Sequence, residues 1–485
     1  MLSRRFARLV GKTALSALGA SALLLIGRDA HASGYLTARF GADHGTPATP
    51  NPYAVYFNPA AMGGTRGTNI VVDASILLRH ATYERGENAL SPDPSNPNRT
   101  NQDYINANTG KGSLTNVLAL PYIGGTTDLG TKDFRLGLAG YIPYGGMATW
   151  SKKGGVAGVP GSTDGPQRWH NIAGTILAMH GTLAASYTIQ PINLSIGASV
   201  SGIYHTVSTV RARNADDSDD ILGPDGSLKE GRSYLTAHGF NVGTTFGLYM
   251  EPAAEKLNHR LKLGLSYISQ PGFGETRMNG ELTQQLGTAS VATATQKIDF
   301  LQSYPDIIRF GAAYKLPNEK WEIKGDFEFV RWSVFDRQCV VLEGKKCDIN
   351  ADGSAVSDAA GRDIVLNLKR DWQNAIGMRV GPSYFVNPEL ELFGSLGFTT
   401  SAVPKATIDA STIDSFRIYA TLGARYELTK HVALAGSYNH IFFLPVDTAG
   451  QSVYAVNKVP SRSPSADGKY NSTIGFLNVN ATFMF

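Results

Sequence analysis

The chain ends in Leu477-Asn478-Val479-Asn480-Ala481-Thr482-Phe483-Met484-Phe485, where apolar and polar side chains alternate up to a terminal aromatic ring. Neighbouring side chains of a strand point to opposite faces, so Leu477, Val479, Ala481, Phe483 and Phe485 would share one face. Asn478, Asn480 and Thr482 would share the other. One apolar and one polar face fit the wall of a transmembrane β-barrel, which separates lipid from a polar lumen. The alternative is a soluble strand that ends in an aromatic residue by chance.

The same alternation recurs along the chain. In 321–329, Trp321 and Ile323 alternate with Glu322 and Lys324, and similar patterns occupy 390–398 and 416–428. A soluble β-sandwich also alternates, but its strands are shorter and its charged face meets water. We therefore predict an all-β fold, an antiparallel transmembrane barrel of about fourteen strands, an even number as in bacterial single-chain barrels. The predicted strands are 69–83, 114–126, 133–144, 175–189, 193–212, 235–251, 260–286, 297–316, 319–335, 371–386, 388–400, 414–428, 430–444 and 472–485.

Residues 1–32 have the features of a signal peptide. Arg4, Arg5, Arg8 and Lys12 form a positive region, and an uncharged Ala/Leu-rich run follows. Ala30-His31-Ala32 then matches a small-x-small cleavage pattern, so Ser33 would be the mature N-terminus. The apolar run is short for a membrane anchor. The sequence thus predicts an exported protein of the bacterial outer membrane.

The composition agrees with an exported barrel. Charged residues make up 17% of the chain, whereas about 25% is usual in soluble proteins. The 53 glycines, 21 tyrosines and 21 phenylalanines suit many strands joined by turns. After the signal peptide no apolar run has helix-spanning length, which excludes a helical membrane protein. The mature chain would be close to neutral, and nothing in it indicates nucleic-acid binding.

Residues 33–66 form an irregular segment ahead of the first strand, broken by four prolines. The barrel is predicted to span 67–485. Short turns such as 316–318 would face the periplasm, and long polar segments would be extracellular loops. These loops are 84–113, 145–171, 213–234, 336–370 and 445–471. The acidic cluster Asp216, Asp217, Asp219 and Asp220 is expected to be part of a solvated loop.

Cys339 and Cys347, the two cysteines of the chain, lie in one polar segment. In an exported protein we expect a disulfide within a loop; a catalytic pair is disfavoured because no C-x-x-C spacing is present. Asp348, Asn350 and Asp352 follow the opening of a calcium-binding loop, but Ala359 stands where a bidentate glutamate is required. We favour a polar loop over a weak calcium site.

Enzyme motifs are absent from the sequence, which has no G-x-S-x-G, no H-E-x-x-H and no complete P-loop. Ser437 and His440 are neighbours in sequence, yet a spacing of three places them on opposite faces of a strand. The ten histidines form no pair at metal-ligand spacing on one predicted face. We therefore expect neither catalysis nor a cofactor.

Seven segments, in a constant order from residue 56 onward, resemble the FadL-type outer-membrane transporters of long-chain fatty acids and their toluene- and xylene-uptake relatives. They are Tyr56-Phe57-Asn58-Pro59-Ala60, Phe134-Arg135-Leu136-Gly137-Leu138 with Pro143-Tyr144-Gly145-Gly146, Gly264-Leu265-Ser266-Tyr267-Ile268-Ser269, Tyr304-Pro305-Asp306 to Gly311, Arg331-Trp332-Ser333-Val334-Phe335, Gly397-Phe398 to Pro404, and Arg417. The chain departs from the family in the prolines of 45–53. The loops 213–234 and 336–370 do not match the family's hydrophobic capture loops.

The resemblance implies a barrel whose lumen holds a hatch, or plug, formed here by 33–66 with its Asn58-Pro59-Ala60 motif. It also implies transport without catalysis: a hydrophobic ligand enters at the outer face and leaves sideways through a gap near the third strand. Gly140, Pro143, Gly145 and Gly146 are the candidates for that gap, because proline removes a ladder donor and glycine tolerates bends. An ordinary strand end is the alternative.

For a carboxylate head group, the candidate contacts are the strand cations Arg309, Lys324, Arg379, Arg417 and Arg425. Ion pairs within a polar lumen explain each of them more simply, although Arg417 also matches a family position. We hypothesise a long-chain fatty acid as the cargo; an aromatic-hydrocarbon channel, a general porin and an outer-membrane lipid enzyme are the alternatives. The expected partners are outer-membrane lipid, lipopolysaccharide and the barrel-assembly machinery, and the protein is expected to be a monomer.

Overall fold

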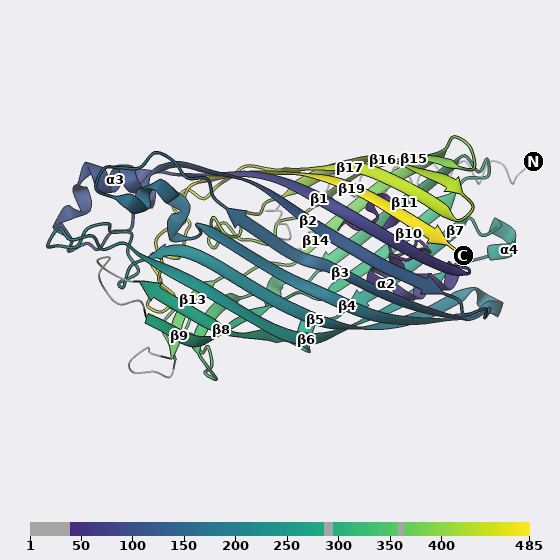
Figure 1. The fold of residues 1–485 in the computed structure, drawn as a ribbon, viewed down its shortest axis with the longest axis horizontal. Coiled ribbons are helices and arrows are strands. Elements are labelled where there is room, and N and C mark those ends of the chain that lie inside the picture. Colours follow the sequence, from purple (N-terminus) through teal and green to yellow (C-terminus); the bar gives the residue numbers. More distant parts are fainter. Residues whose placement is uncertain (1–38, 286–293, 357–362) are drawn as a thin grey trace, which may run out of the picture.

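The computed structural model describes residues 39–285, 294–356 and 363–485. Within these ranges, nineteen strands form one antiparallel sheet, which closes into a barrel of fourteen crossings (Figure 1). The predicted barrel class and the predicted number of crossings are confirmed. The predicted signal peptide, 1–32, lies outside the described residues.

Most crossings are single strands, and the others are broken in two. The unbroken ones are β1 (Thr68–Arg85), β2 (Gly110–Thr127), β3 (Phe134–Thr149), β4 (Ala173–Ile189), β5 (Leu194–Arg213), β6 (Gly231–Met250), β15 (Leu390–Thr399), β16 (Arg417–Thr429) and β19 (Lys469–Met484). The broken ones are β7 (Leu261–Ile268) with β8 (Glu275–Gln285), β9 (Ala294–Ser303) with β10 (Ile307–Lys315), β11 (Trp321–Val330) with β12 (Arg337–Leu342), β13 (Ile364–Lys369) with β14 (Ala375–Phe385), and β17 (Val432–Phe443) with β18 (Val446–Asp447).

Four of the breaks lie in consecutive crossings, from β7/β8 to β13/β14. They contain Pro271 in the 3-10 helix η8 (Pro271–Phe273), Pro305, and the 3-10 helix η9 (Trp332–Val334). Proline cannot donate to a strand ladder, so it ends the pairing locally. In the fourth break, Asp371 has a φ of +46°, outside the range of a strand.

Alternation along each strand decides which side chains meet lipid. In β1, Val72 and Leu78 are 47% and 55% exposed, whereas Asp73 and Leu77 are buried. β1 pairs with β19 from Asn69↔Met484 to Glu84↔Lys469. The first and last strands therefore pair along their whole length and seal the wall.

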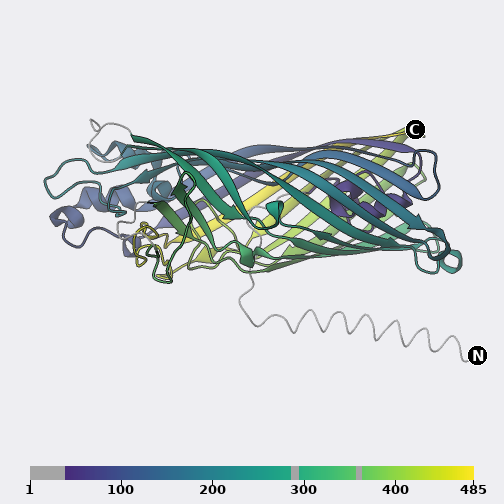
Figure 2. The same ribbon diagram turned by 90° about the horizontal axis from the view of Figure 1, so that it is seen from below.

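The two ends of the barrel differ (Figures 1 and 2). Short turns, the C-terminus, α4 (Ala254–Leu257) and the 3-10 helix η7 (Gln190–Ile192) lie at one end. The long loops at the other end contain η3 (Glu87–Ala89), η4 (Pro97–Thr100), α3 (Gln102–Asn108), η5 (Pro160–Asp164) and η6 (Pro166–Trp169). Short turns are periplasmic in such barrels and long loops extracellular. No helix in the described part of the chain is both long and apolar enough to span a membrane.

The prediction that 336–370 is a loop is partly wrong. This segment contains β12 and β13, which pair with each other, and β12 also pairs with β9. These short strands bury Val340 and Leu366 in one apolar cluster. The polar residues on either side of each strand hide that pattern in the sequence.

The start of the described chain fills the lumen near the periplasmic end. There η1 (Ala42–His44), α2 (Ala54–Phe57) and η2 (Pro59–Gly64) form the plug, seen as the purple segment around α2 in Figure 1. Its Tyr56 ring lies 5.0 Å from the ring of Tyr141 on β3. The wall meets the plug with glycines: a Cβ on Gly197 of β5 would overlap the backbone of Ala60. The plug thus packs directly on the strands.

Candidate functional site

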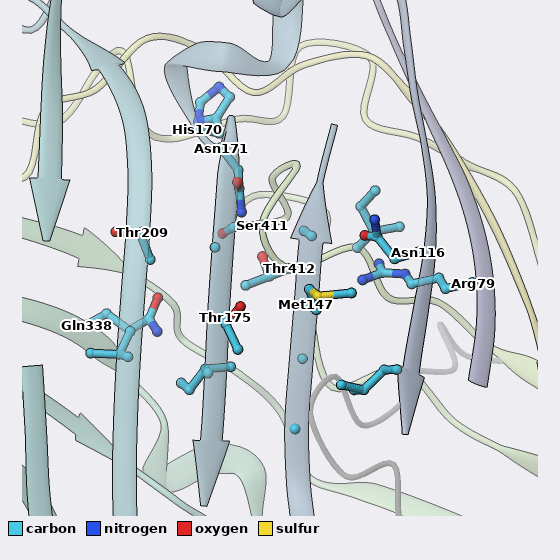
Figure 3. A pocket seen from close by; sticks show the side chains of 18 of the residues that line it. Arg79, Asn116, Met147, His170, Asn171, Thr175, Thr209, Gln338, Ser411 and Thr412 are labelled. Carbon is cyan, nitrogen blue, oxygen red and sulfur yellow. The ribbon is translucent and has the colours of Figure 1, made fainter. Parts of the chain in front are cut away.

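A cavity lies in the lumen between the plug and the extracellular loops (Figure 3). It encloses about 1540 Å³ that no protein atom fills, counting its openings. Much of its lining is apolar, because the lumen-facing positions of several strands carry large hydrophobic side chains here. Examples are Leu77, Leu118, Ile176, Val207, Phe300 and Phe476. Such a surface holds an apolar molecule away from water.

Arginine supplies the charge of the cavity. Arg39, Arg79, Arg211, Arg370 and Arg417 line it, and no aspartate or glutamate among the described residues does. Arg370 forms an ion pair with Asp409, 2.8 Å away, outside the lining. Arg211, on β5, is only 7% exposed and has no ion pair or side-chain hydrogen bond with any residue that the structure describes. A buried cation of this kind favours an anionic ligand.

Neutral polar groups surround the extracellular end of the cavity. His170 and Asn171 lie just before β4, and Ser411 and Thr412 come from the loop between β15 and β16 (Figure 3). Burial lowers the pKa of His170 to about 4, so its imidazole is neutral at pH 7. These neutral groups can donate hydrogen bonds to the polar head group of a ligand or accept hydrogen bonds from it, and they add no charge of their own.

The wall beside the cavity is incomplete. β2 and β3 pair only from Tyr122↔Tyr141 to Thr127↔Leu136. The register of β3 against β4 shifts between Tyr141 and Tyr144, so Ile142 and Pro143 form a bulge. Beyond it, no strand pairing joins 117–121 of β2 to 142–148 of β3, both fully described. This stretch is called the wall gap.

Small and apolar residues line the wall gap. Leu118 on β2 and Gly145, Gly146 and Met147 on β3 all border the cavity, so the cavity reaches the gap. A Cβ on Gly145 would lie 3.5 Å from the side chain of Leu120. The Leu120 side chain therefore packs beside Gly145 and narrows the wall gap at a position where glycine has no side chain.

The Asn58-Pro59-Ala60 segment ties the plug to the wall. Asn58 Nδ2 donates to the carbonyl of Leu248 on β6, 2.9 Å away, and to the carbonyl of Pro47, 2.8 Å away. Its Oδ1 accepts from the amide of Ala60, and Pro59 begins η2. One asparagine thus joins two plug segments and a strand.

This architecture, a closed barrel with an N-terminal plug, has relatives. The family model for outer membrane protein transport protein (OMPP1/FadL/TodX) matches residues 20–485. The chain belongs to the OMPP1/FadL/TodX family. No curated protein sequence matches it.

Solved structures of FadL/TodX type share the fold at low identity. A FadL homologue of Pseudomonas aeruginosa is 15% identical, with a TM-score of 0.71 over 93% of this chain and 100% of that chain. The toluene transporter TodX of P. putida is 15% identical, with a TM-score of 0.61 over 94% and 99%. The toluene transporter TbuX of Ralstonia pickettii is 13% identical, with a TM-score of 0.58 over 93% and 99%.

Membership of the OMPP1/FadL/TodX family confirms the resemblance seen in the sequence. It also confirms the expected class of function, outer-membrane transport of hydrophobic molecules. The family consists of transport proteins, in line with the lack of enzyme motifs in the sequence. It leaves the choice between a fatty acid and an aromatic hydrocarbon open.

Three of the five cations predicted as head-group contacts bind the wall or the plug of this FadL/TodX-type barrel. Arg309 pairs with Glu328, 2.6 Å away, and donates to the hydroxyl of Tyr56 in the plug. Arg379 donates to the plug carbonyls of Ala42 and Gly45 and pairs with Asp326. Lys324 lies 3.3 Å from Glu391, which also contacts His44 of the plug.

The other two predicted cations differ in position. Arg425 pairs with Glu427 on its own strand, 2.8 Å away, and does not line the cavity. Arg417 does line the cavity and lies 3.4 Å from Asp414. Burial raises the pKa of Asp414 to about 7, while Arg417 acts in the opposite direction. The carboxyl group of Asp414, which lies beside Arg417, therefore changes its charge near neutral pH.

The structure joins Cys339 and Cys347 in a disulfide. The expected loop location is wrong for Cys339, which belongs to β12, because that strand pairs with β9 and β13. In the candidate calcium loop, Asp352 pairs with Lys458, 2.8 Å away, and Asn350 donates to Ser354. Ala359 lies outside the described residues, and no group of three or more potential metal ligands occurs among those that are described.

The predicted solvated acidic cluster is wrong for Asp217, Asp219 and Asp220, which are buried. Asp219 forms a fully buried ion pair with Arg85, 2.7 Å away, and accepts a hydrogen bond from Tyr104. Arg85 ends β1 and Tyr104 lies in α3 of the loop that follows, both far from Asp219 in sequence. These contacts tie the loop after β5 to the end of β1 and to the loop after it.

Four of the lining arginines, Arg39, Arg79, Arg211 and Arg370, were not predicted from the sequence. Two of them, Arg79 and Arg211, occupy lumen-facing positions of predicted strands. Arg211 is opposite Ser233 and Arg79 opposite Asn116, whereas Arg309 is opposite Glu328. The register therefore separates Arg211, which is opposite a serine, from Arg309, which is opposite a carboxylate.

Proposed function

We propose that this protein carries long-chain fatty acids across the outer membrane, without a catalytic step. The main support is Arg211, a largely buried arginine that lines an otherwise largely apolar cavity and has no ion pair or side-chain hydrogen bond with a described residue. A fatty acid offers both matching parts, a carboxylate for the guanidinium and an acyl chain for the hydrophobic lining. A carboxylate accepts two hydrogen bonds from one arginine, a geometry that a neutral hydrocarbon lacks.

We further propose that the cargo leaves through the wall gap between β2 and β3. The cavity borders that gap, and the plug fills the lumen below it. Moving an acyl chain into water costs about 25 cal/mol for each Å² of apolar surface. A sideways path keeps the chain out of water, whereas a path through the plug toward the periplasm does not. The bulge at Pro143 and the glycines Gly145 and Gly146 support this exit; Gly140 lies in the paired part of β3 and would only border it.

Uptake of an aromatic hydrocarbon is the second candidate, because the relatives of similar fold include toluene transporters. Five lining arginines favour the acid, since a neutral ring gains little from buried cations. The plug argues against a general porin. A lipid enzyme would need Ser437 and His440 to contact each other. His440 instead contacts Tyr438 and Thr473, while Ser437 faces the lumen.

Uptake of labelled oleate and labelled toluene tests the proposal in a host that lacks its own transporters of both. We expect the protein to raise oleate uptake clearly above that of cells with the empty vector. Toluene uptake that rises while oleate uptake does not would support the aromatic channel instead. Contact with lipopolysaccharide, insertion by the barrel-assembly machinery and a monomeric state remain predictions.

A further inference from the structure

Asn116 of β2 takes the place of a missing rung in the barrel wall. Its Nδ2 donates to the carbonyl of Thr149 on β3, 3.2 Å away, and its Oδ1 accepts from the amide of Thr149, 3.0 Å away. The side chain is buried at the edge of the cavity. One side-chain amide thus satisfies both backbone groups of a residue that an adjacent strand would otherwise pair.

This contact lies at the extracellular limit of the wall gap. Immediately beyond it the strands meet again, through the bridge Leu114↔Trp150 and a 2.9 Å hydrogen bond from the amide of Ser151 to the carbonyl of Ser113. At the other limit, Tyr122 pairs with Tyr141. The gap therefore has two fixed ends: the ladder forms one, and the Asn116 side chain forms the other with the backbone bridge behind it.

We propose that Asn116 sets the length of the exit and so limits the bulk of the cargo that passes through it. This inference rests on the proposed exit through the wall gap. An asparagine spans strands too far apart for backbone pairing, so it holds the wall together without closing the gap. Figure 3 shows Asn116 beside Arg79 and Met147 at the edge of the cavity, so an acyl chain that leaves there passes this side chain.

The chain offers a matched control. Asn241 on β6 donates to the hydroxyl of Thr276 on β8, 2.9 Å away, and so also links two strands by a side-chain amide. It does not line the cavity. Asn116→Ala and Asn241→Ala remove the same chemical group from two places in the wall, and only one of them borders the proposed exit.

The test compares uptake of oleate with uptake of a fatty acid that carries a pyrene ring on its chain. Loss of two hydrogen bonds across the gap should raise the pyrene-to-oleate ratio about fivefold in Asn116→Ala. Asn116→Asp keeps the acceptor but loses the donor, so it should raise the ratio less. Asn241→Ala should leave the ratio unchanged. Heat-modifiable gel mobility reports whether each variant is folded. If Asn116→Ala does not fold, the uptake ratio of Asn116→Asp tests the role of Asn116.

A cross-link separates this inference from the proposed exit. Leu118 on β2 and Met147 on β3 border the cavity from the two sides of the wall gap, and the two native cysteines are bonded to each other. A short thiol cross-linker between Leu118→Cys and Met147→Cys should stop oleate uptake. If uptake stops but the Asn116 variants keep the wild-type ratio, the role of Asn116 is wrong and the exit stands. If the cross-linked protein still transports oleate, both are wrong.

Discussion

Arg211 provides the sharpest prediction about the cargo. Its side chain lines the cavity, is buried and has no ion pair or side-chain hydrogen bond with a described residue. Replacing it with methionine, Arg211→Met, keeps an unbranched side chain, though a shorter one, and removes the charge. A hydrogen bond to a charged group contributes about 1.5 to 3 kcal/mol, so oleate should bind about 10- to 150-fold more weakly to the variant. Methyl oleate, which carries no charge, should bind equally well to both proteins.

The same substitution should stabilise the ligand-free protein. A buried charge without an ion pair or a hydrogen bond is costly, and an apolar side chain lowers that cost. The purified variant in detergent should therefore unfold at a higher temperature than the wild type. Weaker ligand binding together with greater stability distinguishes a binding residue from a structural one.

Isothermal titration of purified protein with oleate and with methyl oleate measures the two affinities. The control is Arg213→Met on the same strand, because Arg213 pairs with Asp217, 3.1 Å away, and does not line the cavity. Equal oleate affinity in the wild type and Arg211→Met would refute the assignment of Arg211 as the head-group contact.

Two further predictions concern the plug and the pH dependence of binding. A Cβ on Gly247 would overlap the side chain of Asn58, so Gly247→Ala should loosen the plug and raise the influx of a hydrophilic dye; Gly181→Ala, with open space around its Cβ, should not. Asp414, whose pKa is about 7, is neutral below that pH and repels an anion above it. Dodecyl sulfonate, charged throughout, should bind about two- to fivefold more tightly at pH 6 than at pH 8. Asp414→Asn should remove this difference; an unchanged pH profile would contradict the role of Asp414.

Much of the barrel could be predicted from alternation, because a wall between lipid and a polar lumen imposes a period of two on every crossing. The breaks within the crossings were harder to see. Pro271 and Pro305 are visible in the sequence, but the alternation resumes on both sides of each, so each crossing reads as one strand. β13 was missed because it follows a long polar stretch and is only six residues long.

The site could be predicted only in part, because partner choice depends on register and on loops. For Arg309 and Arg379 the sequence favours ion pairs within the lumen, and only the folded plug shows that both also hold the plug in place. Asp219 looks solvated in the sequence, and only the folded structure places it against Arg85 at the end of β1. The wall gap also depends on pairing: Pro143 and Gly145 mark an irregular strand, but the loss of pairing with β2 is a property of two strands.

A structure of the protein soaked with oleate would show where the carboxylate and the acyl chain bind. We expect a carboxylate within hydrogen-bond distance of the Arg211 guanidinium and an acyl chain along the apolar lining. A carboxylate bound at Arg425, or an acyl chain found only outside the cavity, would contradict this expectation.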